Sequence, residues 1–193
     1  MKRKIGIIGE GNVGSALRSG LERAGYDVKA VGEDPAAVRD AGAWADAIVL
    51  AVPFAAVGAA VRELGDGVSG KPLVDATNAL TSDMQLAVGL TTSGAEELQK
   101  KVPRAKVVKA FNTVFAGTMS SGRVAGQQLT AFAAGDDAEA KRLALDLERD
   151  IGFDAVDAGP LRNARWLETL GYLNIQLGYG VGMGTGIGFK LVH

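Results

Sequence analysis

The chain has 193 residues, a formal net charge of −1 and no cysteine. This length suffices for one α/β domain with a small appendage. The balanced charge offers no electrostatic basis for binding nucleic acid or an anionic membrane surface. The lack of cysteine excludes disulfides, thiolate metal sites and a cysteine nucleophile. The single histidine, His193, is the last residue, so we expect neither histidine acid–base catalysis nor a bound metal.

Short β-rich runs alternate with helical patterns along the chain. We predict strands at 4–8, 27–31, 47–51, 72–75, 106–110, 129–134 and 153–157, and helices at 12–24, 35–42, 54–64, 93–102 and 137–151. Such alternation predicts a Rossmann-type α/β fold, a doubly wound, mostly parallel sheet with helices on both faces. The apolar run 47–61 contains Pro53 and Gly58 and is too short to span a bilayer. With no room for a signal peptide before the first strand, we expect a cytoplasmic protein.

The first strand leads into a G-x-G-x-x-G turn formed by Gly9, Gly11 and Gly14. Here Gly9 allows a sharp turn, Gly11 lets a pyrophosphate approach the backbone, and Gly14 lets the next helix pack closely. The free N–H groups of the first helical turn then favour phosphate. Because the motif lies between a predicted strand and a helix, and acidic residues follow about twenty positions on, it predicts a dinucleotide site.

Other candidate residues directly follow predicted strands, where ligands of open α/β sheets bind. They are Glu33 and Asp34, then Ala51, Val52 and Pro53, then Asn78 and Asn112. The apolar tripeptide could support a ribose or nicotinamide, or be only a strand-to-helix junction. The two asparagines could orient a carboxamide without ionising, although such residues are also common turn formers.

A change of composition near residue 158 divides residues 1–157, the dinucleotide-binding domain, from a C-terminal segment, 158–193. Residues 161–177 are apolar with helical periodicity. In 178–188 every second residue is glycine, a spacing that disfavours helix and predicts an extended or looped segment. We expect this C-terminal segment to pair subunits in a homodimer and to close the substrate pocket.

The sequence resembles the NADPH-dependent coenzyme F420 reductase family, dinucleotide-binding oxidoreductases related to the reductase module of the STEAP metalloreductases. The matching segments are GIIGEGNVGSAL (6–17), IVLAVPF (48–54), LVDATNAL (73–80), VKAFNTV (108–114), DAGPLRNARWLETL (157–170) and IGFKLV (187–192). The resemblance implies hydride transfer between a nicotinamide and a flavin-like or deazaflavin (F420-type) ring, or a small organic substrate. It also implies that Gly9, Gly11, Asn12, Val13 and Gly14 hold the pyrophosphate, that Ala51, Val52, Pro53, Asn78 and Asn112 border ribose and nicotinamide, and that no residue acts as a catalytic acid or base.

One position departs from the family pattern. Where the family places a hydroxyl residue and an arginine that grip the 2′-phosphate of NADPH, this chain has Glu33 and Asp34. Carboxylates repel a phosphate and accept hydrogen bonds from a free ribose 2′-hydroxyl, so NAD(H) is favoured, with NADP(H) the alternative from the resemblance. A nucleotide-sensing or regulatory protein without turnover is the alternative function.

Overall fold

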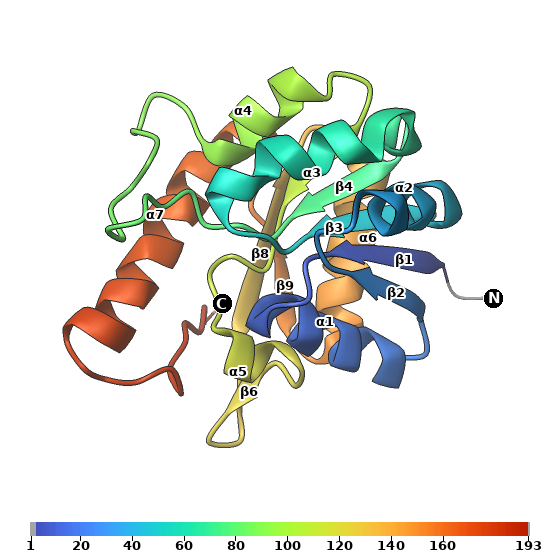
Figure 1. Cartoon of the computed structure of the whole chain (residues 1–193). Coiled ribbons are helices and arrows are strands. Elements are labelled where there is room, and N and C mark those ends of the chain that lie inside the picture. Colours follow the sequence, from blue (N-terminus) through green and yellow to red (C-terminus); the bar gives the residue numbers. More distant parts are fainter. Residues whose placement is uncertain (1–2, 193) are drawn as a thin grey trace.

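The computed structural model describes residues 3–192, and its main feature is one seven-stranded sheet (Figure 1). The strand order is β2-β1-β3-β4-β5-β8-β9. The strands are Lys4–Ile8 (β1), Asp27–Val31 (β2), Ala47–Leu50 (β3), Pro72–Asp75 (β4), Lys106–Lys109 (β5), Thr130–Gly135 (β8) and Asp154–Asp157 (β9). All neighbours pair in parallel except β5 and β8, which are antiparallel. The predicted Rossmann-type, doubly wound fold is confirmed, with one antiparallel junction.

Helices cover both faces of the sheet. They are Asn12–Arg23 (α1), Pro35–Trp44 (α2), Val57–Leu64 (α3), Gly94–Lys101 (α4), Ala116–Met119 (α5), Ala138–Ile151 (α6) and Ala164–Ile175 (α7), with short turns at Phe54–Ala56 (η1), Gly65–Val68 (η2), Leu161–Asn163 (η3) and Gln176–Gly180 (η4). Successive strand residues face opposite sides. Thus Ile7 of β1 packs with Leu17 of α1, whereas Ile8 packs with Val38 of α2.

The order of the strands fixes where a ligand can bind. Strand β1 lies between β2 and β3, so the connection after β1 leads to one side of this strand and the connection after β2 leads back to its other side. The carboxyl ends of β1 and β3 therefore border the crevice at the topological switch point, which is the usual ligand site of such sheets.

The chain beyond β9 returns across the sheet and packs on it. Leu161 and Ala164 are buried in the core cluster beneath α2, α3 and α4. Near the end of the described chain, Thr130 of β8 donates its N–H to the carbonyl of Phe189, and its hydroxyl accepts from the N–H of Leu191. This segment therefore lies beside the first residues of β8. His193 lies outside the described residues.

Besides the short helix α5, two further parts of the chain differ from the expected elements. Residues 178–180, expected to be extended or looped, continue α7 as a π-helical turn, in which Val181 donates to the carbonyl of Gln176. A β-carbon on Gly178 would lie 2.5 Å from the Phe115 ring, so only glycine fits this close packing. A small hairpin, Arg123–Val124 (β6) with Gln127–Gln128 (β7), is the second unexpected feature. Between residues 3 and 192, no helix has the length and apolarity to cross a membrane.

Candidate dinucleotide site

The glycine turn after β1 has three different local geometries. Gly9 has φ +118°, and a β-carbon there would lie 2.2 Å from the Ala51 carbonyl oxygen. A β-carbon on Gly14 would lie 1.9 Å from the Gly9 carbonyl oxygen, so both positions require glycine. At Gly11, the N-cap of α1, a β-carbon would meet nothing within 4 Å. No side chain caps α1, so the N–H groups of its first turn remain available to an anion beside Gly11.

Beside this turn lies a cavity of about 310 Å³ that is lined by two glutamates and mainly by apolar residues. Glu33 and Glu63 line it, and its apolar wall includes Ile8 and Val52. Glu63 is paired with Arg39 of α2 at 2.7 Å. Because β2 ends here, the cavity suits the adenosine part of a dinucleotide.

The two acidic residues after β2 have different roles. The Asp34 carboxylate accepts a hydrogen bond from the Ala37 N–H at 2.8 Å and is the N-cap of α2. Glu33 lines the cavity, and a β-carbon on Gly32 would lie 3.0 Å from the Glu10 carboxylate. Thus Glu10 and Glu33 bring negative charge to this end of the crevice, whereas Asp34 stabilises a helix.

A second cavity of about 290 Å³ shares Val52 with the first and continues the crevice past the glycine turn. It is lined by Gly11, Asn12, Val13, Ala51, Val52, Pro53, Ala76, Thr77 and Asn78. None of these side chains ionises at neutral pH. Seven of the sequence-predicted residues therefore meet around one space, and Gly9 and Gly14 form the turn behind it.

Asn112 does not line this cavity but lies behind Asn78. Its side chain is 3% exposed. Its amide nitrogen donates to the Asn78 side-chain oxygen at 3.2 Å and to the Leu167 carbonyl of α7 at 2.8 Å. Asn78 returns a hydrogen bond to the Asn112 carbonyl at 3.3 Å. The two predicted asparagines are thus brought together, but only Asn78 faces the crevice.

A buried ionic cluster that no sequence pattern predicts lies close behind this site. The Lys109 ammonium is fully buried and lies 3.0 Å from both Asp75 and Glu168. Burial alone would lower the pKa of Lys109, but the two carboxylates raise it above its ordinary value, so the ammonium stays charged. Asp75, Lys109 and Glu168 are far apart in the sequence and belong to β4, β5 and α7. No local pattern could have joined them.

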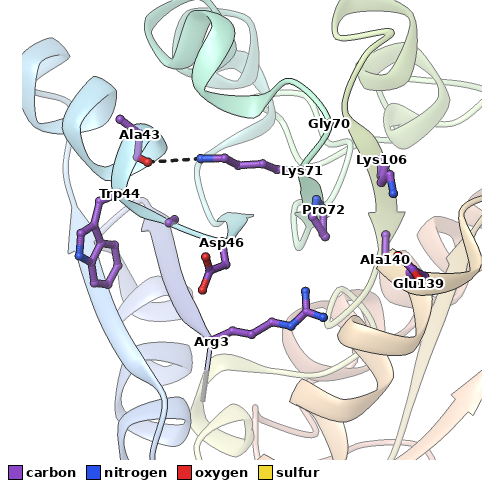
Figure 2. Close-up of a pocket in the computed structure, with 11 residues that line it drawn as sticks. Arg3, Ala43, Trp44, Asp46, Gly70, Lys71, Pro72, Lys106, Glu139 and Ala140 are labelled. Carbon is purple, nitrogen blue, oxygen red and sulfur yellow. Dashed lines mark hydrogen bonds between the residues drawn. The ribbon is translucent and has the colours of Figure 1, made fainter. Parts of the chain in front are cut away.

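Another cavity, of about 550 Å³, lies at the opposite edge of the sheet, where the strands begin (Figure 2). Two of its cations already have partners. Lys71 donates to the Gly42 carbonyl at 2.7 Å, at the C-terminal end of α2, and Lys106 pairs with Asp137 at 3.1 Å. Arg3 extends across the opening. Because these groups serve packing, the crevice at the carboxyl ends remains the candidate site.

The residues of the crevice fit a dinucleotide. Its two adjoining cavities share Val52, and one of them is lined by residues of the uncapped N-terminus of α1. Gly11 is the one glycine of this turn whose β-carbon would meet open space, and it is where a pyrophosphate would approach. Among residues 3–192 there is no group of His, Cys, Asp and Glu side chains able to hold a metal ion.

Known proteins share this architecture. A candidate F420-dependent NADP reductase from Arthrobacter sp. FB24 is 30% identical, covers 99% of this chain and 100% of its own, and superposes with a TM-score of 0.90. A hypothetical protein from Sinorhizobium meliloti is 31% identical over 83% of this chain and 86% of its own, with a TM-score of 0.68. The rat metalloreductase STEAP3 is 28% identical over 86% of this chain, which spans 36% of that protein. No protein-family model matches the sequence.

Proposed function

Because the chain belongs to the NADPH-dependent coenzyme F420 reductase family of dinucleotide-binding oxidoreductases, we propose that it transfers hydride between a nicotinamide dinucleotide and a flavin-like or F420-type acceptor. The observation that carries this proposal is the crevice described above. An open glycine and an uncapped helix N-terminus line one cavity, which has no ionisable side chain, and the adjoining cavity is lined by Glu33.

In this proposal the chain acts mainly by positioning. The N–H groups of the first turn of α1 hold the pyrophosphate, and Ala51, Val52 and Pro53 form a surface for the ribose and nicotinamide. A nicotinamide supplies hydride directly, so the protein needs to align two rings rather than move a proton. The cavity beside Asn78 has no acid or base that a carbonyl reduction would require. This favours a flavin-like acceptor over a small organic substrate.

For the dinucleotide itself we propose NADH over NADPH, although the family name specifies the latter. Glu33 lines the adenosine cavity, and the Glu10 carboxylate lies against Gly32 next to it. Two carboxylates here disfavour a 2′-phosphate and leave Glu33 to accept from a 2′-hydroxyl. Asp34, engaged as an N-cap, is no longer needed for this role.

We also propose a homodimer formed through the C-terminal segment. Large apolar side chains are exposed there: Trp166, Leu173, Tyr179, Val181, Met183, Leu191 and Val192. So many on one continuous stretch is unusual for the surface of a monomer, and a second copy of the chain would cover them. Light scattering at micromolar concentration should give the dimer mass, and a monomer would contradict this part of the proposal. The cytoplasmic location expected from the sequence stays a prediction.

The proposed function is tested with purified protein in two steps. Calorimetric titration with NADH and NADPH measures binding, and NAD(P)H absorbance then follows turnover with FMN, FAD, F420 and a panel of small carbonyls and imines. Binding with turnover of a flavin or F420 is the expected result. Binding without turnover of any acceptor would favour the nucleotide-sensing alternative, and absence of binding would exclude both.

A further inference from the structure

The orientation of the Asn78 side chain depends on a helix that lies outside the crevice. A backbone carbonyl can only accept a hydrogen bond, so the Leu167 carbonyl of α7 must face the amide nitrogen of Asn112. The same nitrogen donates to the Asn78 oxygen, and the Asn78 nitrogen donates to the Asn112 carbonyl. The direction of each hydrogen bond therefore follows from the first.

Helix α7 approaches the two asparagines so closely that only glycine fits at the helix position that contacts them. A β-carbon on Gly171 would lie 2.7 Å from the Asn112 amide nitrogen, from the Asn112 carbonyl oxygen and from the Asn78 side-chain oxygen. None of these atoms is the end of a long flexible side chain, so an added methyl group must move the pair. Gly171 is therefore a packing requirement of the asparagine pair.

The residues around this contact are held rigidly. Glu168, one turn before Tyr172 on α7, accepts hydrogen bonds from the N–H groups of Gly94 and Ala95 and pairs with Lys109. Lys109 also donates to the Thr77 carbonyl at 2.6 Å, directly before Asn78. The cluster thus fastens α7 to the loop that carries Asn78.

The backbone before Asn112 is strained. Phe111 is fully buried with φ +62°, a left-handed conformation that costs a bulky residue free energy. This turn directs Asn112 toward α7, and the side-chain oxygen of Asn112 has no partner among the described residues. A strained backbone and an unpartnered buried oxygen both indicate that the position of Asn112 is maintained at a cost.

We propose that α7 is a positioning element for the nicotinamide end of the crevice, in which the Leu167 carbonyl and Gly171 set, through Asn112, the orientation of the Asn78 carboxamide. This inference rests on the proposed dinucleotide function. Asn78 presents its remaining N–H and its oxygen lone pair to the nicotinamide carboxamide. Asn112 and Gly171 are positioning residues that touch Asn78 and not the ligand.

The test compares two ligands that differ only at the nicotinamide end. NADH and ADP-ribose share the adenosine and pyrophosphate, and calorimetry measures the affinity of each for Gly171→Ala. We expect the Kd for NADH to rise about tenfold while that for ADP-ribose is unchanged. The control is Gly58→Ala on α3, where the added β-carbon lies 3.7 Å from Arg62 in ordinary contact, and both affinities should be retained. If NADPH proves the tighter ligand, the pair becomes NADPH and 2′-phospho-ADP-ribose.

A second variant removes the hydrogen bonds that the Asn112 side chain donates to Leu167 and Asn78. Asn112→Leu keeps a similar shape but lacks the N–H donor, so it should weaken NADH selectively even if Gly171→Ala does not fold. An unchanged ratio of the two affinities in a folded variant, or an equal loss for both ligands, overturns the inference. If the unaltered protein binds neither ligand, the proposed function itself fails, which is a separate outcome.

Discussion

The two ends of the crevice are built in different ways. The phosphate turn uses backbone geometry alone: glycines at three positions of one short segment and an uncapped helix. The end that we propose for the nicotinamide uses the side chains of Asn78 and Asn112, which follow β4 and β5 and lie beside a buried ionic cluster that includes Glu168 of α7. A backbone site tolerates little change in shape but carries no buried charge. In a site built from side chains, substitutions can change how the ligand-facing groups are oriented. The stability of such a site depends on every member of the buried cluster.

The largest effect should come from breaking the ionic cluster. In Glu168→Ala, Lys109 keeps one carboxylate, and the N–H groups of Gly94 and Ala95 lose their acceptor. Loss of one partner of a buried ion pair costs about 3–5 kcal/mol of unfolding free energy. Urea denaturation measures it. The matched control is Arg165→Ala, which removes the partly exposed ion pair to Glu96 between the same two helices and should cost about 1 kcal/mol or less. Equal losses in the two variants would contradict the distinction.

The stability of the folded protein should depend on pH through Glu148 of α6, which contacts the segment that carries Asn112. This fully buried carboxyl accepts a hydrogen bond from the Phe111 N–H at 3.4 Å, and burial raises its pKa to about 8. The folded state then keeps a proton that the unfolded state releases above about pH 4.5. Stability is therefore present at low pH and declines as pH rises toward 8, by up to about 1.4 kcal/mol per pH unit from this group.

Glu148→Gln cannot ionise and tests this expectation. Other carboxylates titrate as well, so the quantity to compare is the difference in unfolding free energy between variant and unaltered protein at pH 5 and at pH 8. Relative to the unaltered protein, the variant should gain stability by several kcal/mol over this range. A difference that does not change with pH would remove Glu148 as the source.

At the phosphate turn, Gly11→Ala should separate binding from folding. The methyl group meets no protein atom within 4 Å and enters the space where a pyrophosphate must approach. Overpacking of this kind costs about 1–3 kcal/mol, so the Kd for NADH should rise about 10–100-fold with little change in Tm. Gly117→Ala, which also adds a methyl group in open space, is the control. Unchanged affinity would place the ligand elsewhere.

The smallest expected effect concerns the choice of dinucleotide. Glu33→Gln keeps the N-cap at Asp34 and removes one of the two carboxylates near the expected 2′-position. We expect the preference for NADH over NADPH to fall about tenfold, or about 1.4 kcal/mol. Titration of both cofactors measures this ratio. Tighter binding of NADPH by the unaltered protein would show that the carboxylates do not decide the choice.

The sequence predicted the parts of the molecule that depend on neighbouring residues. The strand over 4–8 and the turn through Gly14 follow from local periodicity and glycine spacing, and the structure has β1 at Lys4–Ile8. Strands β5 and β8 pair antiparallel. The direction of this pairing depends on the connection between the strands, and the periodicity of the sequence does not predict it. The Ala125–Gly126 turn of the small hairpin, with positive φ at both residues, gave only a weak signal.

At the site, sequence patterns likewise do not tell which of Asn78 and Asn112 faces the crevice. Both follow predicted strands and are equivalent on that criterion. Which one faces the crevice is decided by α7, since Leu167 accepts from Asn112 and Gly171 packs on both residues. Glu168, which joins the buried cluster, has no distinguishing sequence context at all. Contacts between residues this far apart require the fold.

The late position of Glu168 has a consequence for synthesis on the ribosome. Asp75 and Lys109 emerge first and can pair with each other, but α7 completes the cluster and supplies the acceptor for the N–H groups of Gly94 and Ala95. A domain generally folds as a unit, and contacts of long sequence separation form late in folding. The sheet of the growing chain therefore lacks one of its packing helices until α7 is translated. The crevice that we propose for the dinucleotide is therefore completed only after α7 has been translated.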